Sequence, residues 1–438
     1  DRQPGHAAMK VLAIRSLALL LPLLGTAAAW LWRPPTRRAA GAVYLATLWA
    51  LPSLVLIHLM AARFGWWTFR FEGGGLFGMP ADLLLGWALL WGAIPALLLP
   101  RAPLAATAAL MIAIDLALMP LCAPVLILGP QWLQGELAAT AIVLVPAQFL
   151  ARWTARDEHL ASRAFLQVVL FCALILLFLP AVVMSVAGRA PGLPHLPWLV
   201  LQAAIVAAII GLTAVQEFVE RGGGTPFPFD PPKRLVRSGV YAYVRNPMQL
   251  ATALLFLMMG DVWLALIGVM SVVYAAGLAA WDEGADLARF GPPAESYTRQ
   301  VRAWLPSWRP YNEEPATIYF AEGCDACSRF AAMTRALRPR ALHFVAAESH
   351  PTEVLKRVRY EAADGAKADG IAAVARALEH VHLGWALIGF AARLPIARPI
   401  LQLIFDATGA RSVILSRADG EGSPRKRREI LRRLRGSE

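Results

Sequence analysis

The stretch of sequence that decides the fold runs from residue 222 to residue 248 and reads GGGTPFPFDPPKRLVRSGVYAYVRNPM. We call it the central stretch. It is polar, basic and interrupted by Pro and Gly, whereas the sequence on both sides of it is strongly apolar. Inside a bilayer each backbone N–H or C=O group without a partner costs several kcal/mol. The central stretch is therefore predicted to lie at the membrane surface or to line a cavity. Composition alone leaves a simpler interpretation open, a basic linker among lipid headgroups.

The composition of the whole chain indicates an integral membrane protein. Of its 438 residues 58% are hydrophobic and only 16% are charged, and the mean hydropathy is +0.51. A soluble globular protein is about 25% charged. The formal net charge of +12 is concentrated in loops and in the C-terminal tail. It therefore indicates membrane topology and contact with anionic lipid rather than binding to nucleic acid.

Eight apolar runs predict a polytopic α-helical membrane protein. The last run is too long for one span of about 20 residues, so it is predicted to form a hairpin that turns at Gly260 and Asp261, with two short arms. About nine membrane helices result. The first run is compatible with either a retained helix or a cleaved signal peptide. The runs lie near 11–32, 41–62, 81–99, 103–128, 134–151, 165–187, 197–219 and 248–280.

Positive charge follows the alternation that the positive-inside rule requires. The loops on one predicted face carry most of the basic residues, and the opposite loops carry few. This bias places the central stretch and the C-terminal region in the cytoplasm, as expected for a protein of a bacterial inner membrane. The basic residues on the predicted cytoplasmic face are Arg33, Arg37, Arg38, Arg101, Arg152, Arg156, Arg163 and the run from Lys233 to Arg245.

Residues 9–160 form an N-terminal block of membrane helices whose role the sequence does not assign. Ionisable groups inside a membrane are expensive and usually functional. Asp115 lies in the middle of an apolar run, so it needs a partner, and His58 is a candidate. Asp82 and Glu136 lie near predicted helix starts and are interpreted as interfacial caps. Transport through His58 and Asp115 is one hypothesis for this block.

Two motifs, one on each side of the predicted hairpin, indicate a function. The first reads G-T-P-x-P followed by P-P-x-x-L-V-x-x-G-x-Y-x-x-V-R-N-P-M within the central stretch. The second consists of an acidic pair, Phe-Gly, Tyr, Val and Trp-x-Pro. Its residues here are Asp282, Glu283, Phe290, Gly291, Tyr297, Val301, Trp304, Leu305 and Pro306.

Together the two motifs resemble the isoprenylcysteine carboxyl methyltransferase-like and phospholipid methyltransferase-like membrane enzymes, over about residues 200–306. Two positions depart from that pattern: the acidic pair begins with Asp282 rather than Glu, and Gln249 stands where a Tyr is common. The resemblance implies S-adenosylmethionine as cofactor and a lipid bilayer as surroundings. It implies catalytic roles for Arg245 and Glu283. The cofactor-binding set would be Gly239, Tyr241, Arg245, Asn246, Pro247, Gln249, Asp282 and Glu283.

The chemistry of these side chains is compatible with such a cofactor. Arg245 can bind a carboxylate through two parallel hydrogen bonds. Asp282 and Glu283 can bind the ammonium group and offset the sulfonium charge. Gly239 would allow close approach of the backbone, and Tyr241 would supply an aromatic wall. Simpler interpretations remain: Arg245 among headgroups, and the acidic pair at a solvated helix end.

The methyl acceptor is expected to carry a nucleophile that is already ionised when it binds. No histidine lies between His195 and His343, and Asn246 replaces the histidine that is frequent in the family's R-H-P motif. Without an imidazole base, an acceptor that is already anionic, a carboxylate or a thiolate, is favoured. A pocket between membrane helices suits a small or lipophilic acceptor.

After Pro310 the composition changes to that of an α/β domain. A β-prone segment at 316–320 precedes Cys324-x-x-Cys327, then a helix is predicted to about residue 337, and 341–347 is predicted as a strand. Helices are predicted near 370–381, 384–393 and 398–406, and the Arg-rich segment from Ser423 is predicted to form a helix in solvent or on a lipid surface. A strand, a C-x-x-C turn and a helix are typical of a thioredoxin-like start.

This region, about 316–410, resembles the DCC (DUF393) thiol-disulfide oxidoreductase-like family. The resemblance rests on the two cysteines and on the later segments 373–378 and 384–395. It implies a redox role for Cys324 and Cys327. Two idle thiols are the simpler interpretation. A zinc site would need two further ligands, such as His343 and His350, and no metal is expected.

The sequence thus predicts four parts: N-terminal helices (9–160), a membrane methyltransferase core (161–310), a thioredoxin-like domain (311–415) and a basic tail (416–438). The predicted function is methyl transfer from S-adenosylmethionine to a carboxylate or sulfur nucleophile, with an attached thiol-redox domain. The alternative is a membrane thiol-redox protein whose methyltransferase-like half is an inactive scaffold.

Overall fold

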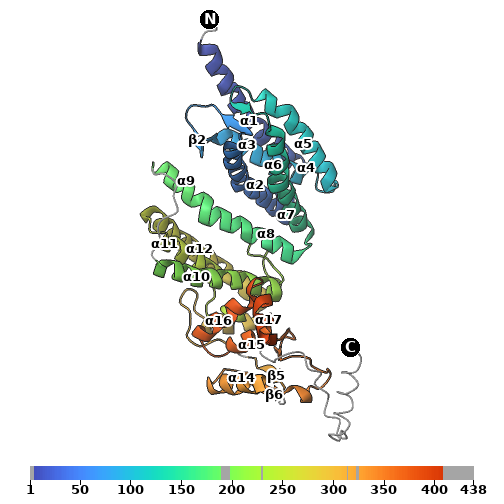
Figure 1. The fold of residues 1–438 in the computed structure, drawn as a ribbon, viewed down its shortest axis with the longest axis vertical. Helices are drawn as coiled ribbons and strands as arrows, with labels where there is room; N and C mark the ends of the chain where they lie inside the picture. The colour runs from blue at the N-terminus through green and yellow to red at the C-terminus, as the bar shows by residue number, and fades with distance from the viewer. Residues whose placement is uncertain (1–3, 189–197, 228–229, 313, 322–324, 408–438) are drawn as a thin grey trace. The chain divides into compact units, whose positions relative to one another are not determined.

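A computed structural model describes residues 4–188, 198–227, 230–312, 314–321 and 325–407 of the chain (Figure 1). The fold is mostly helical, and internal contacts divide it into two compact units. The first unit comprises Asp1–His195, Gly223–Lys233 and Gly260–Leu264. The second comprises Leu196–Gly222, Arg234–Met259 and Ala265–Glu438. The central stretch is therefore shared between the two units.

Seven helical stretches in the described part of the chain are long and apolar enough to cross a membrane. They coincide with the first seven apolar runs of the sequence, which confirms a polytopic helical protein. The stretches are Met9–Trp32 within α1 (Pro4–Trp32), α2 (Arg37–Phe64), Ala81–Leu98 (α3 Ala81–Ala88, η1 Leu89–Ala93, α4 Ile94–Leu98), α5 (Leu104–Leu121), Trp132–Arg156 (α6 Trp132–Ala139, η2 Thr140–Leu144, α7 Val145–Arg156), Leu160–Val186 (α8 Leu160–Cys172, η3 Ala173–Phe178, α9 Leu179–Val186) and Trp198–Gly222 (α10 Trp198–Glu217, η4 Phe218–Gly222).

Four of these stretches contain a π-helical turn, η1, η2, η3 or η4. The first three turns are each followed by a proline at the start of the next α-helical segment, Pro95, Pro146 or Pro180. Proline has no N–H and its ring clashes with the carbonyl four residues earlier. The helix therefore widens locally, and such π-turns are frequent at functional sites.

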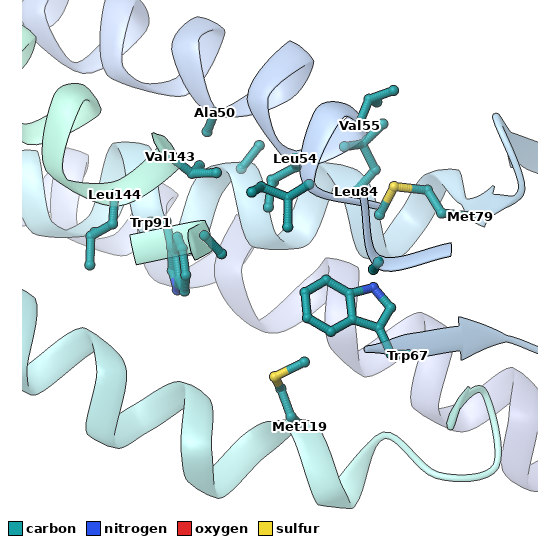
Figure 2. Close-up of a cluster of buried hydrophobic side chains, with 14 of the residues drawn as sticks. Ala50, Leu54, Val55, Trp67, Met79, Leu84, Trp91, Met119, Val143 and Leu144 are labelled. Carbon is teal, nitrogen blue, oxygen red and sulfur yellow. The ribbon is translucent and has the colours of Figure 1, made fainter. Parts of the chain in front are cut away.

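The first unit is a helix bundle with a small β-layer at one end. Strand β1 (Trp67–Phe69) pairs antiparallel with β4 (Leu126–Leu128), and β2 (Gly75–Leu76) forms a hairpin with β3 (Met79–Pro80). Apolar side chains from α2, α3, η1, α5 and η2 fill the centre. Figure 2 shows part of this core, with Trp67, Trp91 and Met119 gathered between the helices.

An ion-pair cluster binds residues 223–233 of the central stretch within the first unit. Asp230 and Arg163 are both buried, and the guanidinium donates to the carboxylate at 2.6 Å. Asp157 accepts from Arg163 at 3.1 Å and from Lys233 at 2.7 Å, and Arg38 bonds both aspartates. Burial alone would raise the pKa of Asp157, but the hydrogen bonds from Lys233 and Arg163 outweigh it and lower the pKa to about 2.

The predicted helical hairpin after the central stretch is confirmed. Helix α11 (Pro247–Met258) ends just before Gly260, which has a φ of 71°, and α12 (Val262–Phe290) begins just after Asp261. Asp261 Oδ1 accepts from the backbone N–H groups of residues 263 and 264, as an N-terminal cap. The apolar arms, Pro247–Met258 and Val262–Tyr274, are shorter than a full span, as expected. Helix α13 (Pro292–Gln300) follows α12.

The C-terminal part contains a four-stranded sheet in the order β6-β5-β7-β8. Strands β5 (Ala316–Phe320) and β6 (Leu342–Ala346) are parallel and flank α14 (Asp325–Ala336), whereas β7 (Arg359–Glu361) pairs antiparallel with both β5 and β8 (Lys367–Asp369). A short 3-10 turn, η6 (Ala347–Ser349), follows β6. The strands predicted at 316–320 and 341–347 are therefore confirmed. The predicted helix in the basic tail lies outside the described residues.

Three helices complete this part, α15 (Ile371–Leu378), α16 (Leu383–Arg393) and α17 (Ala397–Ala407), close to their predicted positions. Helices α16 and α17 meet at 99°. Helix α16 packs against α10 and against η5 (Gly239–Ala242), so the C-terminal helices and the methyltransferase-like region share one core. The sequence placed a domain boundary at residue 311, but packing groups these two regions together.

Two of the ionisable residues in the N-terminal block differ in their surroundings. Asp82 lies in the first turn of α3 and pairs with Arg15 at 2.7 Å, but the N-cap of this helix is Pro80 and no side chain caps it, so the predicted capping role is not seen. Glu136 was predicted to be a similar cap, and this prediction is wrong. Its side chain is buried inside the bundle, where it contacts Asp115. A residue one turn into a helix faces the core when that side of the helix is covered.

Candidate active site

The second half of the central stretch is buried in the second unit. Its residues 240–244, which include most of the turn η5 (Gly239–Ala242), are almost fully buried against α10 and α16. Tyr243 has no exposed surface; its hydroxyl donates to the carbonyl of Glu379 at 2.8 Å, and its ring meets Phe390 edge-on. The aromatic and apolar residues of this segment are therefore core residues that pack against both α10 and α16.

The second motif returns to this segment and pairs with it. The backbone N–H of Arg245 donates to the carbonyl of Arg302 at 3.0 Å, and that of Asn246 donates to Ala303 at 3.2 Å. Two further backbone bonds lie alongside, from Ser307 N–H to the Tyr243 carbonyl (2.9 Å) and from Tyr311 N–H to the Ala242 carbonyl (2.8 Å). Both ends of the helical hairpin thus meet at one place.

The side chain of Tyr297, in the second motif, adds a hydrogen bond between the two motifs. Its buried hydroxyl donates to the carbonyl of Tyr241 at 2.9 Å. Burial raises the pKa of Tyr297, which the nearby Arg245 guanidinium partly opposes, and burial also holds the pKa of Tyr241 well above its usual value. Both phenols therefore stay protonated at neutral pH, and Tyr297 acts as a lasting hydrogen-bond donor.

The residues directly before α11 leave the helical conformation at the edge of the core. Asn246 has a non-helical backbone (φ −116°) and Pro247 begins the helix, as the sequence predicted. Arg245 and Asn246 are half-buried, whereas Gln249 is exposed on the first turn of α11. The Arg245 guanidinium therefore lies at an edge between core and solvent, next to Tyr297.

Gly239 is required for a reason that the sequence did not show. Its φ of 60° is in the left-handed region, and a Cβ at this position would lie 2.6 Å from the carboxyl carbon of Glu217. The ring of Tyr241 is likewise buried next to Phe218. Space beside both residues is thus occupied by protein, and their assignment to cofactor binding stays a prediction.

Glu217 is a residue that sequence reasoning missed. It ends α10, has no exposed surface and binds two arginines from the C-terminal helices, Arg376 at 2.6 Å and Arg393. Ser238 donates to its other oxygen at 2.8 Å. Glu379 completes the group, accepting from Arg393 at 2.6 Å and from Arg376 at 3.2 Å. We call Glu217, Glu379, Arg376 and Arg393 the buried quartet.

Asp282 and Glu283 belong to helix α12, whose backbone is described, but their side chains are outside the described part of the structure. The position of the helix is nevertheless informative. Gly268 of α12 packs against Phe256 of α11. Counting 1.5 Å per residue from this contact along both helices places the Glu283 backbone about 9 Å beyond the level of Pro247. That is the side of the turn on which Arg245 lies.

Of the charged groups that S-adenosylmethionine presents, the described half of the site offers a chemical counterpart for one. The α-carboxylate of that molecule needs a guanidinium or an equivalent donor pair, and Arg245 offers one at the edge of the core, beside a fixed phenol. Its ammonium and sulfonium groups need anions, which the sequence predicts at Asp282 and Glu283. The fit therefore rests on Arg245 and on the direction in which α12 runs.

Of the C-x-x-C pair, Cys324 lies outside the described residues. Helix α14 begins at the next residue, Asp325, and Cys327 is buried in its first turn against the sheet. Among the described residues no group of three or more His, Cys, Asp or Glu side chains is placed to hold a metal ion.

Comparison with known proteins finds no matching family model, no similar curated protein and no similar solved structure.

Proposed function

We propose that this protein is a membrane methyltransferase that uses S-adenosylmethionine. One observation carries the proposal: the two motifs that suggested it are joined by direct hydrogen bonds. Tyr297 bonds the Tyr241 carbonyl, and the backbone of Arg245 bonds Arg302. A shared cofactor site requires the two motifs to lie together, and this contact supports the proposal.

Each part of the chain has a role in this proposal. Arg245 binds the cofactor carboxylate, and its orientation is kept by the paired backbone and by Tyr297. Asp282 and Glu283 bind the ammonium group and offset the sulfonium charge. When bound, S-adenosylmethionine supplies an electrophilic methyl group. The protein contributes mainly positioning, which can offset on the order of 7–11 kcal/mol of an activation barrier.

The acceptor is proposed to be small or lipophilic and to bring an anionic carboxylate or sulfur atom. The phenols of Tyr241 and Tyr297 do not serve as bases, because burial keeps them protonated. Asn246 cannot accept a proton either. The motifs therefore supply no general base, and the nucleophile must already be ionised when it binds.

Calorimetric titration of the full-length protein in detergent with S-adenosylmethionine tests this function. Wild type is expected to bind, and Arg245→Lys to bind at least about tenfold more weakly, because a lysine cannot make the paired bonds. Glu283→Gln should also weaken binding. Arg302→Lys is the matched control, since its side chain is exposed and only its backbone takes part. Absent binding by wild type would favour the alternative, an inactive scaffold attached to a redox protein.

We further propose that residues 311–415 form a thioredoxin-like domain in which Cys324 and Cys327 exchange electrons with a thiol, on the cytoplasmic side of an inner membrane. The parallel β5–α14–β6 unit supports this, because a helix that starts directly after a cysteine stabilises its thiolate. The double variant Cys324→Ser/Cys327→Ser should lose methyltransferase activity under oxidising conditions and regain it with a small thiol. Unchanged activity under those conditions would exclude the redox role.

A further inference from the structure

The first unit contains a cavity of about 50 Å³ between α2, α5, α6 and the strands β1 and β4. Its walls are mostly aromatic and aliphatic, and Figure 2 shows Trp67, Met79, Trp91 and Met119 among the side chains around it. Three ionisable residues also line it, His58, Asp115 and Glu136. The methyltransferase proposal uses none of them.

Two of these residues form a carboxyl pair. Asp115 is 1% exposed and Glu136 is 3% exposed, and their side chains are in hydrogen-bonding contact. The indole N–H of Trp87 donates to Asp115 Oδ1 at 2.6 Å. Among the described residues, no lysine or arginine lines the cavity. Two ionised carboxylates cannot share such a place without a cation, so the pair must hold a proton.

Within the described part of the chain, three polar atoms at the cavity have no hydrogen-bond partner. They are Glu136 Oε1, His58 Nδ1 and the indole N–H of Trp91, and all three side chains are more than nine-tenths buried. The other ring nitrogen of His58 faces Gly78. The first two atoms can accept a hydrogen bond and the third can only donate one. A ligand that satisfies all three must both donate and accept.

The size of the cavity narrows the choice of ligand. A water molecule needs about 10–15 Å³ of such space, whereas an apolar cavity that binds benzene measures about 150 Å³. The cavity therefore has room for a few waters and not for an organic substrate. A metal cation would be repelled by the indole N–H of Trp91 and would find few oxygens. Water and a proton fit the donors and acceptors that are present.

The cavity lies close to one end of the bundle. His58 and Asp115 are each six residues from the ends of their helices, Phe64 and Leu121, which is about 9 Å. Glu136 is about 6 Å from the start of α6. The β1–β4 pair and β3 line or adjoin this end. A proton can therefore enter from one face through a short path, and the π-turn η1 places Trp91 in the wall.

We propose that this cavity is a hydrated proton site. The Asp115–Glu136 pair carries one shared proton, and water in the cavity passes that proton to Nδ1 of His58. In this step the carboxyl O–H bond breaks and an N–H bond forms on the imidazole. Both carboxyl groups are then ionised, and the new imidazolium supplies the cation that the two carboxylates need. No oxidant or second substrate is needed. The site gives the N-terminal block a proton-transfer function that is independent of methyl transfer.

Infrared spectroscopy of the full-length protein in lipid tests the proposal. Ordinary carboxyl groups are ionised at pH 7, so a C=O stretching band of a protonated carboxyl should come from this pair and should move to lower frequency in D₂O. The double variant Asp115→Asn/Glu136→Gln should lose the band. Asp82→Asn should keep it, because Asp82 is paired with Arg15. A wild-type protein without the band, or a double variant that keeps it, overturns the shared proton.

Two further arms test the relay and the nature of the ligand. His58→Gln should move the pH at which the band disappears by at least about one unit, and an unchanged pH profile excludes His58 as the acceptor. Replacing choline chloride by sodium chloride at fixed pH should leave the band unchanged. Loss of the band on adding sodium would instead show a metal-cation site. If the double variant fails to fold, the wild-type D₂O, pH and sodium measurements still decide the question.

Discussion

Replacing Glu217 by Gln should strongly destabilise the second unit. The buried quartet contains two carboxylates and two guanidinium groups, of which Glu217 is 0%, Glu379 6%, Arg376 7% and Arg393 3% exposed. Its two negative and two positive formal charges cancel, so removing one of the four leaves a net charge; Glu220, whose side chain is 45% exposed, lies farther from the two arginines, at 3.5 and 3.7 Å. Removing one partner of a buried ion pair costs about 3–5 kcal/mol, because the remaining charge stays buried without compensation. A glutamine can still accept one hydrogen bond, so we expect the lower end, about 3 kcal/mol.

Thermal unfolding of the detergent-purified protein, followed by tryptophan fluorescence, measures this effect. Glu295→Gln is the matched control, since Glu295 forms an exposed i,i+4 pair with Arg299 that is worth about 0.3–0.5 kcal/mol. The double variant Glu217→Gln/Arg393→Gln restores the charge balance. It should be less destabilised than the sum of the two single variants by about 0.5–3 kcal/mol. If Glu217→Gln unfolds at the same temperature as the control, or if the two substitutions are additive, the quartet does not stabilise the unit as an ionic group.

Three other predictions concern local strain and pH. Gly239→Ala should lower the unfolding midpoint by several degrees, because residue 239 has a positive φ and the new Cβ would clash with the carboxylate of Glu217. Gly277→Ala in α12 is the control: a Cβ there would have no neighbour within 4 Å, so the midpoint should stay unchanged or rise. Burial lowers the pKa of His380 to about 4 in the folded protein, whereas the unfolded imidazole titrates near pH 6.5. The free energy of unfolding should therefore fall as the pH drops from about 6.5 towards 4, and it should fall less in His380→Gln. Burial raises the pKa of Asp157, but Lys233 and two arginines outweigh this effect and lower the pKa to about 2. The stability that the ionised Asp157 adds should therefore be lost as the pH falls from about 4 to about 2. Acid unfolding of Asp157→Asn should accordingly depend less steeply on pH.

The sequence predicted the helices and strands well where one element is defined by its own residues. The apolar runs located the seven long helices, because length and hydropathy depend only on local composition. Gly260 and Asp261 located the hairpin turn, since a left-handed glycine and a capping aspartate are local signals. The β-prone segments around Cys324 and Cys327 located β5 and β6 for the same reason.

Packing between distant segments could not be predicted in this way. Helix α16 has an apolar face that suits the interior of a separate domain, but that face buries Tyr243 through Phe390. No periodicity states which surface a helix will cover. Glu136 was misjudged because its position near a helix start is typical of a cap, whereas α5 brings Asp115 against it. Glu217 was missed because its arginine partners lie in helices α15 and α16 of the C-terminal part.

The shared core gives a physical reason for joining the two C-terminal parts in one chain. The segment that carries Arg245 contains only the short turn η5 and is rich in aromatic residues, so alone it would expose both backbone and rings. The second motif pairs with its backbone through Arg302 and Ala303, and α16 covers its rings. The carboxylate of Glu217 packs against Gly239. Its charge is neutralised by Arg376 of α15 and Arg393 of α16. The C-terminal helices are thus part of the support of the proposed methyltransferase site, whatever chemistry the two cysteines perform.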